Sequence, residues 1–429
     1  MEKHQLEHVF TPTSSAKVTF VERKKINNRL VRALATPGTQ VVIYGYSGAG
    51  KTTLLENVLN RTYEKQINTN CMKGMTFEQV ILDAFDQLEE FYVGEVTNNK
   101  KHQINTKAKT EYLAIQAQIS TQVESSTGDK QVRVIPPQLS PQNLGRLLGE
   151  SGYCWVLEDF HKIEGEDKEK LAQLMKVFVN LSSEHPDLKV IALGAVNTAH
   201  QVVKLDKEMR LRISEIHVSL MSEDEIKNII SIGCLALNIV IGNELQSEIV
   251  KYSNGLASIC HKICQLMCFS AEIHETVDET YEFTQEDLDN AISDYLEDAE
   301  DSLRHSFDRA FRINKIFNVL QVLIKFDSNG AHIEDLFEKS KEYSINITKK
   351  KLEEDLNTLM GEEHGEIIKF EESSSKYSFI DPFYRCFAMV FLEEKDKNMK
   401  RAPLTQTELT EIFNRALVSV RTEFLEHMN

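Results

Sequence analysis

The segment Gly45-Tyr46-Ser47-Gly48-Ala49-Gly50-Lys51-Thr52 carries the residue types that bind phosphate groups. Its spacing matches the pattern GxxxxGK[ST], in which glycines let backbone N–H groups converge on phosphate oxygens. Lys51 would neutralise the β- and γ-phosphates, and the Thr52 hydroxyl would coordinate Mg²⁺. The sequence therefore predicts a site for ATP and Mg²⁺. The predicted phosphate-binding residues are Gly45, Ser47, Gly48, Ala49, Gly50, Lys51, Thr52 and Thr53.

The elements on either side of this loop are those that such a site requires. Four apolar residues, Val41 to Tyr44, run directly into the first glycine, and such a run between turn signals is typical of a buried parallel strand. A helix is predicted from Thr52 to Asn60, so its N-terminus and the positive end of its dipole face the phosphates. This strand–loop–helix context makes a chance glycine turn a poor explanation.

Two acids follow a second apolar run, Cys154 to Leu157. One of Glu158 and Asp159 would hold Mg²⁺ and the other would orient or deprotonate the attacking water. Alignment gives Glu158 the metal position and Asp159 the base position, although ATPases of this kind usually have Asp before Glu. A shift of one residue in strand register would exchange the two roles, so both acids join Thr52 as predicted metal ligands. His161 either caps the strand, which we favour, or contacts the γ-phosphate.

Three further polar residues are candidates for the same reaction. Asn197 comes just after the apolar run 189–194, where an amide can hydrogen-bond the attacking water or the γ-phosphate. Arg210 and Arg212 precede the last predicted core strand, and either can project onto the γ-phosphate of a neighbouring subunit. The alternatives are an ordinary turn asparagine and surface arginines paired with nearby glutamates.

Alternation of strands and helices predicts an α/β fold, a three-layer parallel-sheet ATPase core over residues 1–220, with a polar insertion at about 92–140. Further core strands are predicted at 153–157, 189–194 and 213–220, with helices at 78–91, 167–183 and 198–208. Helical periodicity then continues through a lid, residues 221–312. Ser222 and Thr284 each provide a hydroxyl N-cap before an acidic first turn.

The remaining chain, residues 313–395, reads as three helices followed by a two-stranded hairpin, which is the winged-helix arrangement. Helices are predicted at 315–326, 333–343 and 348–360, and strands at 366–371 and 376–380. A final amphipathic helix is predicted at 406–427, within the segment 396–429.

Composition limits the classes of partner. The 429 residues carry a net charge of −17, and thirteen acids with no Lys or Arg lie between Glu272 and Asp301, a charge that repels nucleic acid. No run of eighteen apolar residues and no secretory signal is present, which favours a cytoplasmic protein that does not contact membranes. Cys260, Cys264 and Cys268 recur every four residues, a spacing more typical of a buried helix stripe than of a metal site.

Together these motifs resemble the AAA+/STAND superfamily, in the branch shared by origin-recognition ATPases and STAND signalling NTPases. The resemblance covers about residues 18–392. Thr19 to Arg23 is similar to the F-x-x-R box, which would place Arg23 near the adenine. Tyr252 to Ala257 resembles the lid segment, but Ser258 stands where a sensor arginine is usual, and His261 or Lys262 is the candidate substitute. Phe379 to Arg385 resembles the segment that ends the winged helix in STAND-like ATPases.

The resemblance implies an ATPase that converts ATP and water to ADP and phosphate, switches conformation with its nucleotide and self-assembles as a homo-oligomer. It implies a separate effector protein under its control, in a bacterial antiphage defence system. The alternatives are a DNA-bound initiator or loader that uses its winged helix, and an ATP-dependent chaperone or adaptor. We disfavour nucleic acid, because residues 313–392 have a net charge of −4 and Glu353, Glu354 and Asp355 follow the three lysines of the third helix.

Overall fold

The structure is a computed structural model that describes residues 3–88, 140–196, 209, 211–298, 301–311, 316–343, 345, 347–371 and 374–400. The chain forms two compact units. The first comprises Met1–Ile239, Gly255–His261 and His274–Glu279, and the second comprises Val240–Asn254, Lys262–Ile273 and Thr280–Asn429.

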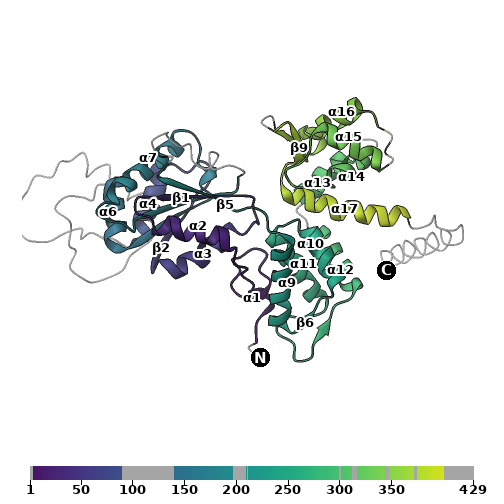
Figure 1. Cartoon of the computed structure of the whole chain (residues 1–429), viewed down its shortest axis with the longest axis horizontal. Helices are drawn as coiled ribbons and strands as arrows, with labels where there is room; N and C mark the ends of the chain where they lie inside the picture. The colour runs from purple at the N-terminus through teal and green to yellow at the C-terminus, as the bar shows by residue number, and fades with distance from the viewer. Residues whose placement is uncertain are drawn as a thin grey trace, which may run out of the picture. The chain divides into compact units, whose positions relative to one another are not determined.

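A five-stranded parallel sheet lies at the centre of the first unit, between helices (Figure 1). Its strand order is β2-β3-β4-β1-β5. Tyr44, the last residue of β1, pairs with Gly194 of β4 and His217 of β5, so these three strands end together. The glycine loop leaves the sheet at this carboxyl edge. The strands are β1 (Gln40–Tyr44), β2 (Lys65–Asn70), β3 (Tyr153–Glu158), β4 (Lys189–Gly194) and β5 (Ile213–His217).

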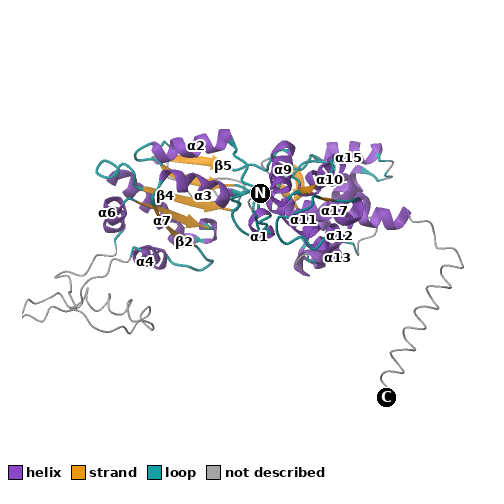
Figure 2. Ribbon diagram, turned by 90° about the horizontal axis from the view of Figure 1, so that it is seen from below, coloured by secondary structure: helices purple, strands orange, loops and turns teal. Residues whose placement is uncertain are grey.

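Helices cover both faces of this sheet, which gives the predicted three-layer α/β core (Figure 2). Alternate residues of β1 face opposite layers: Val41 and Ile43 pack with α2 and α3, whereas Val42 packs with α4, α6 and α7. Trp155 of β3 is fully buried on the second face. The helices are α2 (Lys24–Ala35), α3 (Lys51–Thr62), α4 (Phe77–Gln87), α6 (Pro141–Ser151) and α7 (Gly165–Leu181), and a 3₁₀ turn, η1 (Phe160–Lys162), follows β3.

The first unit differs from the sequence prediction in three elements. Strand β2 was not predicted, because only Ile67 and Thr69 of its six residues are buried and it lies at the sheet edge. Helix α6 was not predicted either, although Ser140 caps it and Pro141 begins it. Strand β5 ends at residue 217 rather than 220. The predicted insertion at 92–140, except residue 140, and the predicted helix at 198–208 lie outside the described residues.

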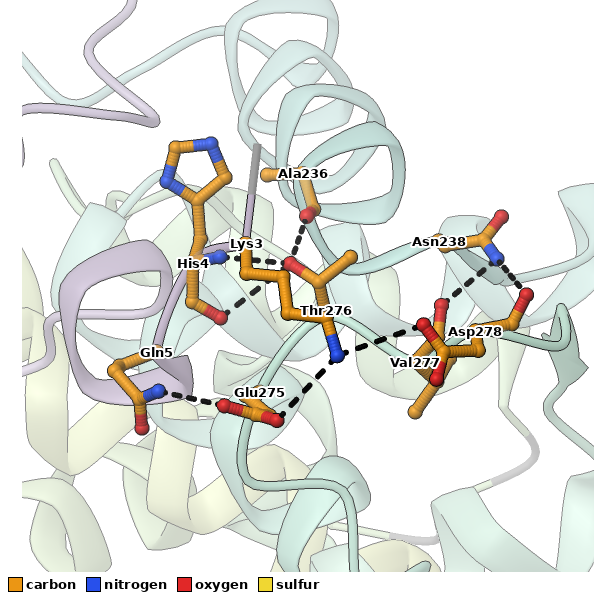
Figure 3. A network of polar contacts seen from close by, with 9 residues as sticks. All are labelled: Lys3, His4, Gln5, Ala236, Asn238, Glu275, Thr276, Val277 and Asp278. Atoms are coloured by element: carbon orange, nitrogen blue, oxygen red, sulfur yellow. Dashed lines mark hydrogen bonds and ion pairs between the residues drawn. The ribbon is translucent and has the colours of Figure 1, made fainter. Parts of the chain in front are cut away.

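The N-terminal segment of the first unit pairs with a segment far along the chain (Figure 3). The His4 N–H donates to Thr276 Oγ1 at 2.8 Å, and the Thr276 N–H donates to the His4 carbonyl at 2.9 Å. Gln5 Nε2 donates to Glu275 Oε2 at 2.8 Å. Helix α1 (Leu6–Val9) follows and contacts α9 (Glu223–Leu237). The N-terminal segment from His4 to Val9 is therefore part of the folded first unit.

Both predicted helix N-caps are confirmed. The Ser222 hydroxyl accepts from the Glu225 N–H, and the Glu225 side chain accepts in return from the Ser222 N–H. Thr284 and Asp287 make the same reciprocal pair at the start of α12 (Gln285–Glu297). These capping boxes satisfy backbone donors that the first helical turn leaves unpaired.

The second unit contains the three helices and antiparallel hairpin that the sequence predicts, which we call the helix–hairpin module (residues 316–400). Its elements are α14 (Ile316–Leu323), α15 (Ile333–Glu342), α16 (Lys349–Leu359), η3 (Glu362–His364), β8 (Ile368–Glu371), β9 (Lys376–Phe379) and α17 (Pro382–Lys400). The long helix α17 was not predicted as a separate element. The remaining elements are β6 (Ile239–Val240), α10 (Asn243–Ser253), α11 (Ala257–Ser270, shared by the two units), β7 (Tyr281–Glu282) and α13 (Asp301–Ala310). The predicted helix at 406–427 lies outside the described residues.

The cysteine stripe on α11 is buried. Cys260, Cys264 and Cys268 are each 0% exposed, as a helix packed by its apolar face requires. Across the described part of the chain, no helix combines the length and the apolar composition needed to cross a membrane.

Lys189 at the start of β4 is fully buried, and its Nζ donates to the Thr36 carbonyl at 2.6 Å. Burial lowers its pKa to about 8, although Asp187 acts in the opposite direction. Since the unfolded chain keeps the usual lysine pKa near 10.5, it binds more protons between about pH 8 and pH 10.5, and folding stability rises with pH across that window.

Lys189→Met should therefore raise the free energy of unfolding at pH 7 by on the order of 2 kcal/mol. The gain should shrink at pH 10, where the wild-type lysine is largely neutral. Urea unfolding of both proteins at the two pH values measures this difference, with the exposed Lys65→Met as the control. An equal gain at both pH values would mean that packing, not charge burial, sets the effect.

Candidate functional site

Glycine conformations shape the loop that begins at Gly45. Gly45, Gly48 and Gly50 have φ angles of 149°, 70° and 87°, which side chains with a Cβ rarely adopt. A Cβ on Gly45 would also lie 2.2 Å from the Val218 carbonyl oxygen, so no other residue fits there. Gly50 then forms the N-cap of α3, which begins at Lys51. The loop thus presents the helix N-terminus at the carboxyl edge of the sheet.

Lys51 folds back over this loop. Its Nζ donates to the Gly45 carbonyl at 3.0 Å and to the Tyr46 carbonyl at 2.8 Å. These bonds hold the ammonium group within the loop, where a phosphate would otherwise be its natural partner.

Glu158 is the last residue of β3, and its carboxylate accepts a hydrogen bond from the Thr52 hydroxyl. Burial raises the pKa of Glu158, and the nearby charges of Asp159 and Glu56 raise it further, while Lys51 and the Thr52 hydrogen bond lower it. The structure therefore brings together the loop hydroxyl and the strand-end acid that the sequence singled out. Sequence reasoning missed Glu56, which lies one helical turn after Thr52 and could have been found by that spacing.

This cluster fits a magnesium ion. The described residues contain no group of three or more His, Cys, Asp or Glu side chains that alone could hold a metal. Mg²⁺ at a phosphate site, however, needs only one or two protein oxygens, because phosphate oxygens and waters complete its shell. The Thr52 hydroxyl and the Glu158 carboxylate are such oxygens, and the nearby carboxylates of Asp159 and Glu56 add negative charge that favours a cation.

Asp159 adopts a different orientation. Its backbone is left-handed, with φ 52°, and its carboxylate lies 2.7 Å from Lys162 Nζ. The side chain is 47% exposed. Asp159 is thus close enough to influence Glu158 but is paired with Lys162 and open to solvent.

The side chain of His161 bonds the chain just beyond the neighbouring strand β4, whereas the sequence favoured a cap on its own strand, β3. Its Nδ1 accepts from the Ala195 N–H at 3.3 Å, just beyond the end of β4. Burial lowers the pKa of His161, in keeping with a neutral ring that accepts this bond. Asn197, two residues further on, and Arg210 lie outside the described residues.

Arg23 is buried in a polar network of the first unit rather than exposed toward a ligand. Its Nε donates to Glu225 at 3.1 Å, and its Nη1 donates to the Ser219 carbonyl at 2.8 Å. Its Nη2 reaches Ser219 Oγ and the Leu220 carbonyl. These bonds fix the start of α2 to the chain that follows β5. Contact with adenine stays a prediction.

Arg212 is exposed and immediately precedes β5, at the amino end of the strand. The glycine loop leaves the sheet at the opposite, carboxyl edge. With a rise of about 3.3 Å per residue, the five residues of β5 place Arg212 roughly 15 Å from that edge. Arg212 therefore lies too far away to contact phosphates bound by its own loop.

The first turn of α11 contacts the loop directly. The Ser258 N–H donates to the Gly48 carbonyl at 3.4 Å, and Ser258 Oγ is buried with no hydrogen-bond partner in the described part of the chain. His261 is 3% exposed, and its Nδ1 accepts from the Thr11 N–H at 3.1 Å. Lys262 pairs with Asp298 at 2.8 Å. Both candidate substitutes for a sensor arginine are therefore engaged elsewhere, whereas Ser258 of α11 contacts the loop.

No protein-family model and no curated protein sequence matches the chain. Solved structures do. A Walker-type ATPase of Pyrococcus abyssi aligns over 86% of this chain and 96% of its own, with a TM-score of 0.50 and 17% identity. The chain has the fold of a P-loop ATPase. Orc1 of Aeropyrum pernix, solved in complex with DNA, aligns over 92% of this chain and 97% of its own, with a TM-score of 0.44 and 14% identity. RuvB of Thermotoga maritima, a Holliday junction branch migration motor, aligns over 85% of this chain and 94% of its own, with a TM-score of 0.39 and 12% identity.

Proposed function

We propose that this protein binds ATP with Mg²⁺, hydrolyses it to ADP and phosphate, and changes conformation and assembly with its nucleotide. The observation that carries the proposal is the cluster of Lys51, Thr52 and Glu158, which joins the glycine loop to the end of the adjacent strand. Purified protein should release phosphate from ATP only when Mg²⁺ is present. The absence of both ATP binding and hydrolysis would refute the proposal.

Each residue of the cluster has a role that its position supports. Backbone N–H groups from Ser47 to Thr53 hold the phosphates, and the Lys51 ammonium exchanges its carbonyl partners for phosphate oxygens. Thr52 and Glu158 would hold Mg²⁺, which when bound neutralises phosphate charge in the transition state. Asp159 would orient or deprotonate the attacking water once its ion pair with Lys162 is broken. Asn197 would hydrogen-bond that water or the γ-phosphate.

An arginine from a neighbouring copy would complete the site. Arg212 is exposed at the sheet end away from its own loop, so it can reach a γ-phosphate only in another subunit. Arg210 is the alternative donor. An arginine that acts in trans contributes about 10³-fold or more to turnover in related chemistry.

A mixing experiment tests this assembly. Arg212→Ala and Asp159→Asn should each be nearly inactive alone. Their mixture should recover activity, because some interfaces then join an intact Arg212 to an intact Asp159. Arg32→Ala, at an exposed arginine on α2, is the matched control and should be fully active alone. A monomeric mass under conditions of full hydrolysis would contradict the model.

For the biological role, we propose a regulatory ATPase that controls a separate effector, with bacterial antiphage defence as the setting that the family resemblance implies. The charge of α16 supports this choice over a DNA-bound initiator. Lys349 pairs with Glu334 at 2.5 Å and Lys351 with Asp355 at 2.7 Å, while Lys350 lies 4.0 Å from Glu354. The lysines that would face phosphates therefore already have acidic neighbours.

DNA binding should consequently be weak, with a shallow dependence on salt. A protein that neutralises several phosphates shows a log–log slope of about −0.9 per contact. The variant Lys349→Glu/Lys350→Glu should leave both DNA binding and ATP hydrolysis unchanged. Lys351 is kept, because its partner Asp355 is 3% exposed and would be left buried and unpaired. Sub-micromolar duplex binding in physiological salt that stimulates hydrolysis and disappears in this variant would favour the initiator.

A further inference from the structure

The chain passes from the second unit to the first between Asn254 and Gly255. Both residues are left-handed, with φ angles of 48° and 76°. A Cβ on Gly255 would lie 2.6 Å from the Met221 carbonyl oxygen, and the Met221 N–H donates to the Gly255 carbonyl at 2.8 Å. Gly255 is thereby fixed against the chain that follows β5. We call Asn254 and Gly255 the hinge.

Beyond the hinge, the chain reaches the glycine loop within three residues. Ser258 donates its N–H to the Gly48 carbonyl at 3.4 Å. Gly48 lies in the middle of the predicted phosphate cradle, so the segment that follows the hinge contacts this cradle directly.

On the second-unit side of the hinge, Asn254 is held by the helix–hairpin module. Its Oδ1 accepts a hydrogen bond from Arg385 Nη1, and its Nδ2 donates to Ser328 Oγ at 3.0 Å. Arg385 is 8% exposed, and its Nε and Nη2 donate to the carbonyls of Phe326 and Ile324, each at 2.8 Å. One buried guanidinium at the start of α17 thus joins the segment that follows α14 to Asn254.

We propose that Arg385 is a positioning residue for the nucleotide site: it sets the hinge through Asn254 and so sets the contact of Ser258 with Gly48. The helix–hairpin module and bound ATP then influence each other, since coupling between two sites is reciprocal. A partner that displaces the module would change ATP affinity by way of this arginine. The inference rests on the proposed ATP binding.

The test compares nucleotide affinity in variants on both sides of the bond, measured with fluorescent ATP and ADP analogues well below the unfolding temperature. Arg385→Gln should change the Kd for ATP by about 5-fold or more, the lower range of known couplings. Asn254→Gly, which keeps the left-handed backbone but removes the amide, should have a similar effect. The double variant should match either single variant, because both remove one interaction.

Two further variants separate this role from general stability. Asn254→Asp keeps the acceptor oxygen and should retain wild-type affinity. Arg309→Gln removes an arginine of α13 whose Nη1 donates to the Glu362 carbonyl, away from the hinge, and should leave affinity unchanged. A merely structural role for Arg385 would lower the unfolding temperature without shifting Kd.

The outcomes also separate the two proposals. If the wild-type protein binds no ATP analogue, the proposed function is wrong. Suppose instead that the wild-type protein binds ATP but the Kd is unchanged in Asn254→Gly and Arg385→Gln. That result, or additive changes in the double variant, overturns the hinge inference alone. If Arg385→Gln does not fold, the contrast between Asn254→Gly and Asn254→Asp decides, and equal affinities in those two contradict the inference.

Discussion

Replacing Lys51 with alanine should weaken ATP binding by about 100-fold or more. The Lys51 ammonium has two carbonyl partners in the loop, Gly45 and Tyr46, and we expect phosphate oxygens to replace them when ATP binds. Charge-assisted hydrogen bonds contribute about 1.5–3 kcal/mol each, and 1.4 kcal/mol corresponds to a tenfold change in affinity. Isothermal titration with ATP and Mg²⁺ measures the loss.

Lys65→Ala is the control for this variant. Lys65 is an exposed lysine at the start of β2, where its Nζ lies 5.3 Å from the centre of the Tyr153 ring, at the sheet end opposite the glycine loop. Its loss should leave ATP affinity unchanged. Equal affinity in Lys51→Ala and wild-type protein would place the nucleotide elsewhere.

The strands next to the nucleotide loop were predictable because they are buried on both faces. Such strands are continuous apolar runs, as at Val41–Tyr44 and 153–157, and turn residues mark their ends. The glycine pattern then fixed the order of strand, loop and helix. In this part of the molecule, local composition and tertiary burial agree.

The edge strand β2 was not predictable by the same signal. Its sequence, residues 65–70, is mostly polar, and only Ile67 and Thr69 face the core. Thr69 can be buried because its hydroxyl group has partners there: Oγ1 donates to Asp83 Oδ2 at 2.6 Å and accepts from the Trp155 indole at 3.0 Å. A strand stabilised by such contacts is specified by residues far from it in sequence, which no local pattern reports.

The contacts of α11 beside the glycine loop were unpredictable for a related reason. His261 was a reasonable candidate for a phosphate contact because it lies close to the lid segment. Its ring instead binds the backbone of Thr11, 250 residues earlier, and burial lowers its pKa to about 4, so it stays neutral at physiological pH. Only the folded N-terminal segment shows that this histidine has a structural partner.

The roles of Glu158 and Asp159 at the end of β3 should be distinguishable by how the turnover of their variants depends on Mg²⁺ concentration. Glu158→Gln and Asp159→Asn should both bind ATP and lose turnover by about 100-fold or more, the usual contribution of a positioned acid or base. Glu158→Gln should also need a higher Mg²⁺ concentration, because Glu158 is the acid bonded to Thr52. Asp159→Asn should keep the wild-type Mg²⁺ requirement, because Asp159 is directed to Lys162. The opposite result, a higher Mg²⁺ requirement in Asp159→Asn alone, would assign Asp159 to the metal and Glu158 to the attacking water.

The raised pKa of Glu158 adds a pH test to the same pair. Protonation of Glu158 removes a ligand for Mg²⁺, so as pH falls toward the raised pKa the Mg²⁺ concentration for half-maximal turnover should rise in wild-type protein. Glu158→Gln cannot titrate there, and its Mg²⁺ requirement should be less sensitive to pH. Glu64→Gln, at an exposed acid before β2, is the control and should behave as wild type. Full turnover in both Glu158→Gln and Asp159→Asn would show that neither acid serves the nucleotide site, and the assignment of this strand end to catalysis would have to be abandoned.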